Sequence, residues 1–263
     1  MKVIFSAGRA EGFQQTPILA GKQPHSNMAS VSLEAKTFTV GTIYCVGKNY
    51  EAHAKEMRDR LGLDFPDTAA AQEPIVFSKP ASALIHSGES IAIPHFRGKA
   101  ISSEMHHELE LVVLVGQRAV QVSEERAADY VAGFGIGLDM TLRDRQTEAK
   151  KNGQPWLLSK GFRTAAVVSD FVSRPLHEVS EMAIELKKNG KRVQFGYPRE
   201  MTFSISFLIS YLSHIFGLEA GDLIFTGTPE GVGKVQTGDT LTATLHGKTG
   251  VLTELHTRVG EQK

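Results

Sequence analysis

The sequence predicts a fold built mainly of β-strands with few helices. Short runs of strand-forming residues recur along the chain, and several of them alternate apolar with polar or small residues. Asn189 and Gly190 lie between two such runs as a type I′ hairpin signal, and residues 238–259 alternate on both sides of a second turn near 246–250. The helical spacing of apolar residues is clearest in 203–218, where Gly217 is placed to end a core helix.

Composition restricts the classes of function. The 263 residues are 41% apolar, enough for a substantial core in one large domain or in a small and a larger one. Lys plus Arg and Asp plus Glu both number 29, so no excess of positive charge favours nucleic acid, and a small molecule is the expected partner. No apolar stretch reaches the roughly 18 residues of a membrane span.

The single cysteine, Cys45, excludes an intrachain disulfide and a cysteine-based zinc cluster, and it fits a reducing compartment. A buried structural thiol is favoured over a nucleophile, because the flanking residues indicate a core strand. We expect a cytoplasmic protein, or one of the mitochondrial matrix if the source is eukaryotic.

The first quarter of the chain is mixed in character. Residues 1–40 are weakly patterned, with no signal-peptide core and little support for a transit peptide. A strand is predicted at 42–46, followed by a helix over about 51–60. Residues 62–74 contain two prolines and several alanines, and they indicate a loop that could act as a lid.

Further elements follow from local patterns. Strands are expected at 75–80 and within 87–94, and Ser123 is placed to cap a helix with two glutamates in its first turn. A basic helical segment should follow Gln146. Residues 221–233 predict a strand that enters a glycine-rich loop, whose backbone could hold an anion.

Residues 104–116 place two glutamates at the start of a strongly apolar run. In a strand, the period of two puts Glu108 and Glu110 on one face. In a helix the two residues would lie on nearly opposite sides, and the β-branched valines of this stretch are poor helix formers. Neighbouring carboxylates repel each other unless a proton or a cation holds them together. The stretch therefore indicates either a Mg2+ or Mn2+ site of oxygen ligands, or an exposed strand end with solvated glutamates.

Residues 131–141 alternate strictly, and they supply a possible third ligand. Gly133, Gly135, Gly137 and Asp139 share one face of the predicted strand, and the opposite face is apolar. Glycine weakens a strand, so three at alternate positions indicate close packing or a site. Asp139 could complete the set of carboxylates.

Two other groups have both a functional and an ordinary interpretation. His53 and Glu56 are three residues apart on a predicted helix, so they form either a base with its orienting carboxylate or a surface pair. Lys160 has apolar neighbours in the sequence. Most such lysines reach solvent, although a desolvated one beside a metal-bound anion would be a good electrostatic partner.

Taken in order, these motifs resemble those of the fumarylacetoacetate hydrolase family, in particular its short acylpyruvase-like members. The resemblance covers about residues 42–259. It is carried by Tyr44-Cys-Val-Gly-Lys-Asn-Tyr50 with His53 and Glu56, His107-Glu-Leu-Glu-Leu111, Leu138-Asp-Met-Thr141 with Arg143 and Gln146, Pro155-Trp156 with Lys160, and Gly221-Asp222 leading to Thr226-Gly-Thr-Pro-Glu-Gly-Val-Gly233. Each motif alone is weak, but five in this order are highly specific.

The resemblance implies an α+β fold, a mixed β-roll with few helices, and commonly a homodimer. It implies an N-terminal extension at 1–40 and a catalytic domain at 41–263, although short members typically begin near Met28. It also implies residue roles. One Mg2+ or Mn2+ would be bound by Glu108, Glu110 and Asp139, water would be activated by His53 and Glu56, Lys160 would face the substrate, and its carboxylate or distal acyl group would be positioned by Arg143, Gln146 and Thr228.

The implied activity is metal-dependent hydrolysis of a C–C bond in an acylpyruvate, a 2,4-diketo acid such as fumarylpyruvate or acetylpyruvate. The alternative is decarboxylation or keto-enol tautomerisation of oxaloacetate at the same site, and the residues do not separate these outcomes. A catalytically silent binding protein would be favoured by loss of a metal ligand or of the His53 and Glu56 pair, and the sequence retains both.

Overall fold

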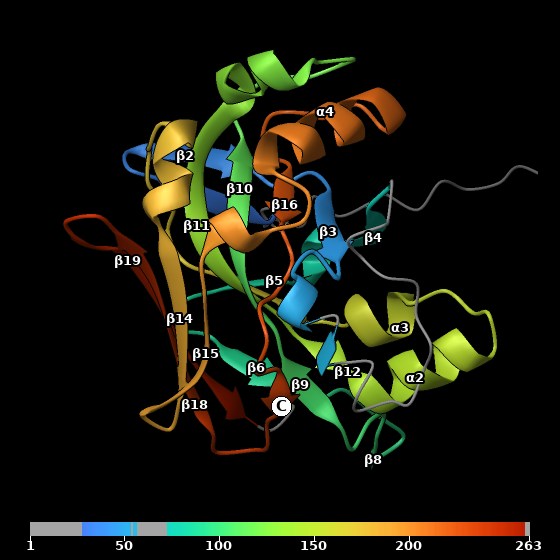
Figure 1. Cartoon of the computed structure of the whole chain (residues 1–263). Helices are drawn as coiled ribbons and strands as arrows, with labels where there is room; N and C mark the ends of the chain where they lie inside the picture. The colour runs from blue at the N-terminus through green and yellow to red at the C-terminus, as the bar shows by residue number, and fades with distance from the viewer. Residues whose placement is uncertain (1–27, 54, 57–72, 261–263) are drawn as a thin grey trace, which may run out of the picture.

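The computed structural model describes residues 28–53, 55–56 and 73–260 (Figure 1). Strands dominate, and the described helices are few and short, which confirms the expected α+β class. Residues 51–53 and 55–56 are helical, as predicted, while the rest of the predicted helix to residue 60 and most of the possible lid at 62–74 lie outside the described residues.

A seven-stranded mixed sheet carries two of the candidate metal ligands, Glu110 and Asp139. Its strands, in spatial order, are β4 (Ile75–Lys79), β3 (Ile43–Gly47), β16 (Leu223–Phe225), β10 (Leu109–Val115), β11 (Val131–Asp139), β13 (Ala166–Val168) and β5 (Leu84–His86). The central strand, β10, is antiparallel to both of its neighbours, while β3 with β16 and β13 with β5 are parallel pairs. The start of β10 therefore lies beside the end of β11, where charged side chains were expected.

A five-stranded sheet lies against the first one. Its order is β15 (Lys191–Gly196), β14 (Ala183–Lys188), β18 (Thr240–Gly247), β19 (Gly250–Gly260) and β6 (Ser90–Ala92). Asn189 and Gly190 both have positive φ, 51° and 78°, as the predicted type I′ turn requires. The second predicted hairpin, β18 with β19, is also confirmed.

Three small sheets complete the strand set. They are β12 (Thr141–Leu142) with β9 (Met105–His107) and β17 (Gly233–Lys234), β1 (Ser30–Leu33) with β2 (Lys36–Thr39), and β7 (His95–Phe96) with β8 (Lys99–Ala100). The predicted continuous strand over 104–116 is thus two strands, β9 and β10, interrupted at Glu108. Figure 1 shows β9 and β12 at the end of β10 and β11 that also meets α2 and α3.

Both faces of the seven-stranded sheet are buried. Along β10, Leu111 and Val113 belong to a large apolar cluster that includes residues of the five-stranded sheet and of α4, whereas Val112 and Leu114 belong to a second cluster behind the sheet. A strand buried on both faces favours the continuous apolar run seen in the sequence. Val31 from β1 lies in the second cluster. The division at residue 40 stays a prediction, but part of the segment before it packs on the body.

The helices are short. Besides the helical residues 51–53 and 55–56, the helices of the described ranges are α2 (Arg143–Lys151), α3 (Leu157–Lys160), α4 (Ile205–Ile215) and the 3-10 helices η2 (Ala81–Ala83), η3 (Glu124–Tyr130), η4 (Leu176–Glu181) and η5 (Pro198–Glu200). Gly217 has φ 69° just after α4, as predicted. Within the described ranges, no helix has both the length and the apolar character needed to cross a bilayer.

Two details of the predicted helices were wrong. Ile215 and Phe216, expected on the core face of the apolar helix, are exposed, because α4 ends as these residues pass the edge of the core. The helix after Ser123 is a 3-10 helix, and the Ser123 side chain makes no capping hydrogen bond to its backbone.

Candidate active site

Three carboxylates meet where β10 begins and β11 ends. Glu108 precedes β10, Glu110 lies on it, and Asp139 is the last residue of β11. The antiparallel register pairs Glu110 with Gly137, and the backbone N–H of Asp139 donates to the carbonyl of Glu108 at 2.8 Å. One oxygen from each side chain lies within 4.8 Å of the others, and all three residues are buried. The exposed strand end considered from the sequence is therefore excluded.

Glycine residues allow the chain segments beside the carboxylates to pack closely together. A Cβ atom on Gly137 would lie 2.7 Å from a methyl carbon of Val112 on the adjacent strand β10, and 2.6 Å from a ring carbon of Phe225 on β16, one strand further on. Such contacts are too short for any larger residue, so the glycine face of β11 reflects packing. Gly227 has φ +101°, and its backbone N–H donates to Glu110 Oε2 at 2.7 Å.

Lys160 contacts two of the carboxylates from α3. Its Nζ donates to Glu108 Oε2 at 2.7 Å, to Asp139 Oδ2 at 2.6 Å and to the hydroxyl of Thr141 at 2.7 Å. These three acceptors use the full donor capacity of an ammonium group. The side chain is buried, so the expectation that it would reach solvent is excluded, and its ammonium also lies 5.0 Å from the ring centroid of Phe77.

A second buried lysine, Lys79, was not predicted as a site residue. Its Nζ lies 2.7 Å from Asp139 Oδ1 and donates to the backbone carbonyl of Lys160. One signal could have identified it. In the predicted strand over 75–80, the period of two places Lys79 on the same face as Ile75 and Phe77. Both Ile75 and Phe77 line the pocket described below.

Arg143 supplies a third positive charge at the start of α2. Its Nη2 is hydrogen-bonded to Glu108 Oε1, and its Nη1 donates to the side-chain oxygen of Gln146 at 2.6 Å. The spacing of three residues places Arg143 and Gln146 on one face of α2, as the contact requires. The helix thus begins with an arginine that contacts Glu108 and a glutamine that contacts this arginine.

The three carboxyl groups differ electrostatically. Burial alone would raise the pKa of Glu108, but Lys160 and Arg143 lower it well below the ordinary value. Burial raises the pKa of Glu110 well above the ordinary value, and Asp139 and Glu108 raise it further. The cluster thus contains one carboxyl group that needs either a proton or additional positive charge.

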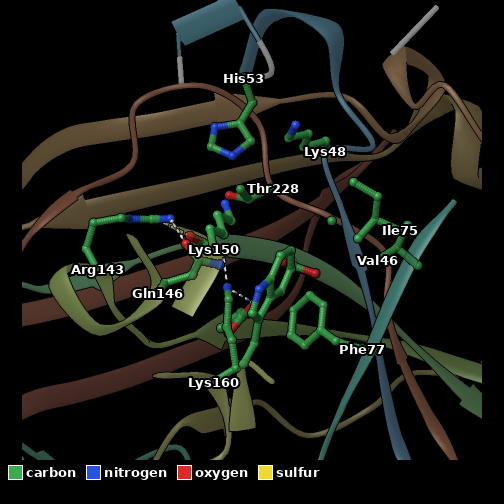
Figure 2. Close-up of a pocket in the computed structure, with 15 residues that line it drawn as sticks. Val46, Lys48, His53, Ile75, Phe77, Arg143, Gln146, Lys150, Lys160 and Thr228 are labelled. Atoms are coloured by element: carbon green, nitrogen blue, oxygen red, sulfur yellow. Dashed lines mark hydrogen bonds and ion pairs between the residues drawn. The ribbon is translucent and has the colours of Figure 1, made fainter. Parts of the chain in front are cut away.

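His53 faces this cluster across a pocket (Figure 2). Its Nδ1 lies 3.7 Å from Glu56 Oε2, which is an ion-pair distance but too long for a hydrogen bond. Glu56 Oε2 also accepts from the backbone N–H of Gly231 at 2.9 Å, so the glycine-rich loop holds this carboxylate. The two residues are therefore neighbours, as the spacing predicted.

The free volume inside the pocket is about 40 Å3. All the predicted site residues except Glu56 line it. Figure 2 shows Arg143 and Gln146 on one side of the pocket and the apolar side chains of Val46, Ile75 and Phe77 on the other.

Several buried polar atoms of pocket residues lack a hydrogen-bond partner in the described part of the chain. They are His53 Nδ1, Arg143 Nε and Asp139 Oδ1, the last of which lies near Lys79 Nζ without the geometry of a hydrogen bond. Native proteins leave few such atoms, and a bound ion, water or ligand is the usual reason. Carboxylate oxygens from three residues converge here, and Glu110 needs additional positive charge. The residues therefore fit a hard divalent cation such as Mg2+ or Mn2+.

Thr228 enters the pocket from the loop after β16, and a second residue that was not predicted holds it. Gln194, on β15, donates through Nε2 to the hydroxyl oxygen of Thr228 at 2.8 Å. Its Oε1 accepts from the backbone N–H of Leu109 at 3.0 Å and lies 2.9 Å from His107 Nδ1. The buried amide of Gln194 therefore connects β10, at Leu109, to the loop that carries Thr228.

Cys45 lies on β3 and is buried, which confirms the predicted structural position. Burial, followed by the negative charge of Asp139, raises the pKa of its thiol well above the ordinary value. A thiol held neutral in this way is a poor nucleophile.

Comparison with known proteins agrees with the geometry. The family described as fumarylacetoacetate (FAA) hydrolase C-terminal matches residues 42–259. The oxaloacetate tautomerase FAHD1, mitochondrial, of Bos taurus is 44% identical over 206 residues, which are 78% of this chain and 87% of the relative. The protein of the same name from Arabidopsis thaliana is 38% identical over 232 residues, covering 88% of this chain and 98% of the relative.

A solved structure is also similar. Fumarylpyruvate hydrolase from Pseudomonas aeruginosa, in complex with Mn2+ and pyruvate, superposes with a TM-score of 0.74 at 34% identity, covering 89% of this chain and 96% of that one. The relatives therefore include proteins named for two reactions, a tautomerisation and a hydrolysis.

Proposed function

This chain belongs to the fumarylacetoacetate hydrolase family, and from that membership we propose that it is a Mg2+- or Mn2+-dependent hydrolase of acylpyruvates. The substrate would be a 2,4-diketo acid such as fumarylpyruvate or acetylpyruvate. The observation that carries the proposal is the buried cluster of Glu108, Glu110 and Asp139 with His53 facing it across a pocket.

The three carboxylates would hold one divalent cation, which supplies positive charge that polarises the 2-oxo group of the substrate. Lys160 and Lys79 fix the two carboxyl oxygens of Asp139 and so orient this ligand. Arg143 Nε is a buried donor without a hydrogen-bond partner among the described residues, which suits a substrate carboxylate, and Gln146 and Thr228 lie beside the same space.

His53 would take a proton from water, and the water oxygen would add to C4 of the diketo acid. The C3–C4 bond would then break, and its electron pair would pass into the 2-oxo half, which leaves as pyruvate after taking up a proton. Glu56 would orient the imidazole and stabilise its protonated form. Their separation of 3.7 Å requires only a small movement to become a hydrogen bond.

The alternative is decarboxylation or tautomerisation of oxaloacetate at the same site. Two similar proteins named oxaloacetate tautomerase, at 44% and 38% identity, favour it. Neither reaction needs the addition of water to a carbon atom. A silent binding protein is disfavoured, because the candidate ligands and the His53 and Glu56 pair are all present.

Further properties belong to the same proposal. We propose a homodimer, which would cover exposed apolar side chains such as Leu157 and Phe216, with the catalytic domain spanning 41–263. We propose that the protein is cytoplasmic, or lies in the mitochondrial matrix if the source is eukaryotic; the names of the eukaryotic relatives include the word mitochondrial. Light scattering of the purified chain would test the dimer.

A substrate panel tests the reaction. Acetylpyruvate, fumarylpyruvate and the keto and enol forms of oxaloacetate should be assayed with Mg2+, with Mn2+ and with a chelator. Hydrolysis predicts metal-dependent loss of the diketo acid with release of pyruvate and the matching carboxylic acid. Turnover of oxaloacetate alone would replace the main proposal by the alternative, and binding without any turnover would favour the silent protein.

A further inference from the structure

One peptide group connects a candidate metal ligand to the segment that carries His53. It is the peptide between Thr226 and Gly227, in the loop after β16. The N–H of Gly227 donates to Glu110 Oε2 at 2.7 Å. The carbonyl of Thr226 accepts from the side-chain amide of Asn49 at 2.8 Å. Because a peptide whose carbonyl accepts a hydrogen bond is a better donor at its N–H, Asn49 both orients and strengthens the bond that holds Glu110.

This peptide group is packed tightly against Asn49. Gly227 has φ +101°, and a Cβ atom there would lie 2.7 Å from the Cβ of Asn49 and 3.2 Å from the carbonyl oxygen of Val46. Only glycine fits this conformation in so narrow a space. Thr226 is fixed as well, because its backbone N–H and its hydroxyl both donate to the carbonyl of Leu111 on β10, at 3.1 and 2.9 Å. The peptide is therefore held with its carbonyl toward the amide and its N–H toward the carboxylate.

Asn49 also fastens the segment that carries His53 to the body of the protein. It lies two residues after β3 and two residues before the helical residues 51–53. Its Oδ1 accepts from the backbone N–H of Phe203 at 2.7 Å, and its Nδ2 donates to the carbonyl of Phe203 at 3.0 Å. The backbone carbonyl of Asn49 accepts from the N–H of Thr202 at 2.8 Å. The residue is fully buried, and both hydrogens of its amide nitrogen are used.

The position of His53 depends on this anchor. Its Nδ1 is buried and has no hydrogen-bond partner in the described part of the chain, and Glu56 Oε2 lies 3.7 Å away from it. The ring is therefore placed mainly by the backbone that begins at Asn49. One buried amide thus fixes His53 on one side of the pocket and Glu110 in the cluster that His53 faces.

We propose that Asn49 is a positioning residue that sets the place of His53 relative to the metal ligand Glu110. It holds Glu110 through the peptide group of residues 226 and 227, and it holds His53 through the chain that follows it. This inference rests on the proposed function, because it takes Glu110 as a metal ligand and His53 as the base. Asn49 belongs to a motif that carries the family resemblance, but the sequence assigned no role to it.

The same pair of strands offers a matched control at its other end. β3 and β16 are parallel, and Asn49 and Thr226 follow them, whereas Asp222 precedes β16. Asp222 is buried, and its carboxyl oxygens accept from the N–H groups of Thr42 at 2.7 Å and Glu219 at 2.9 Å. Asp222→Ala therefore removes buried hydrogen bonds between backbone segments, as Asn49→Ala does, but roughly 13 Å further along the strand. A purely structural defect should affect both variants alike.

Calorimetry of Mn2+ binding tests the connection to Glu110. Asn49→Ala should weaken Mn2+ binding by about 10- to 100-fold, the usual effect of removing a group that orients a metal ligand. Asp222→Ala should leave the affinity unchanged, although it lowers the melting temperature as well. Asn49→Ser, whose hydroxyl replaces part of the amide, should show a smaller loss of affinity, and it carries the comparison alone if Asn49→Ala does not fold.

Hydrolysis at saturating Mn2+ tests the connection to His53. Excess Mn2+ restores occupancy of the site, so the loss that remains in Asn49→Ala reports the placement of the base. The kcat for acetylpyruvate should then fall by about 10- to 100-fold, as a displaced catalytic group predicts, while KM changes less. Asp222→Ala should retain the kcat of the wild type.

The outcomes separate this inference from the proposed function. If the wild type hydrolyses no acylpyruvate but Asn49→Ala weakens Mn2+ binding and Asp222→Ala does not, the proposed hydrolysis is wrong and the connection to Glu110 stands. If hydrolysis is confirmed but Asn49→Ala binds Mn2+ and turns over like Asp222→Ala, the positioning role is wrong. A full return of kcat at saturating Mn2+ would overturn the connection to His53.

Discussion

The side-chain amide of Gln194 donates a 2.8 Å hydrogen bond to the hydroxyl oxygen of Thr228, beneath the candidate active site. Backbone partners fix the orientation of this amide, because Oε1 accepts from the N–H of Leu109 and Nε2 donates to the carbonyl of Pro229 at 3.0 Å. His107 Nδ1, 2.9 Å from Oε1, must therefore be the protonated ring nitrogen. Thr228 accepts from Gln194 and keeps its own hydrogen for an acceptor in the pocket or for its long contact with Pro229.

Gln194→Leu is expected to lower the free energy of unfolding by about 2 to 5 kcal/mol, because it leaves the buried N–H groups of Leu109 and His107 without an acceptor. Urea denaturation of the metal-free protein measures the change. A stability equal to the wild type would mean that water replaces the amide and that the connection is not structural.

Thr228→Val provides the comparison for Gln194. It removes only the hydroxyl group, so the expected loss of stability is about 1 kcal/mol, while KM for an acylpyruvate should rise if the hydroxyl donates to the substrate. An unchanged KM with the same small loss of stability would restrict Thr228 to a packing role.

Glu110 offers a clean test of the metal site. Among the described residues no cationic side chain forms an ion pair with it, whereas Glu108 pairs with Lys160 and Arg143. Burial and the neighbouring carboxylates raise the pKa of Glu110, so the neutral amide of Glu110→Gln suits the metal-free site, and the melting temperature of the metal-free protein should stay equal or rise. The same change should abolish the stabilisation by Mn2+, which is about 5 °C or more for the wild type at a hundredfold excess over Kd.

Glu108→Gln is the matched variant for this test, because it leaves two buried cations with less compensation and should lower the melting temperature before any metal is added. Scanning fluorimetry with Mn2+ and with chelator gives both quantities. If Glu110→Gln retains the full Mn2+ shift, Glu110 is not a metal ligand.

The sequence predicted the parts of the site that depend on local periodicity. The period of two in β11 placed Asp139 at the end of a glycine face, and the same period brought Glu108 and Glu110 together, although it missed the break between β9 and β10. Spacing on one helix placed His53 near Glu56 and Arg143 near Gln146. In each case the partners are at most four residues apart or on adjacent antiparallel strands with a clear pattern.

The residues that were missed depend on pairing between distant segments. Lys79 contacts the carbonyl of Lys160, 81 residues away, and Gln194 contacts Thr228 and Leu109, 34 and 85 residues away. A lysine or glutamine in a strand usually points to solvent, so neither residue type signals burial by itself. Only the packed arrangement of the sheets shows that both are buried among acceptors and donors.

The role of His53 can be separated from binding by comparing two reactions in one variant. If His53 takes the proton from water, His53→Ala should slow acylpyruvate hydrolysis by about 10²- to 10⁴-fold, the usual effect of a positioned general base. Decarboxylation of oxaloacetate needs no addition of water to a carbon atom, so it should lose less activity. Glu56→Gln should follow with a smaller loss, because Glu56 Oε2 lies 3.7 Å from the imidazole and supports its protonated form.

The ratio of the two activities cancels errors in the concentration of active enzyme, and His214→Ala is a suitable control, since that histidine is exposed on α4 and distant from the pocket lining. His53 itself is buried, and its Nδ1 has no hydrogen-bond partner in the described part of the chain, so its removal costs few native contacts. Calorimetry should therefore show nearly unchanged Mn2+ affinity in His53→Ala. Equal losses in hydrolysis and decarboxylation would assign His53 to substrate binding, and activation of water would then need another base.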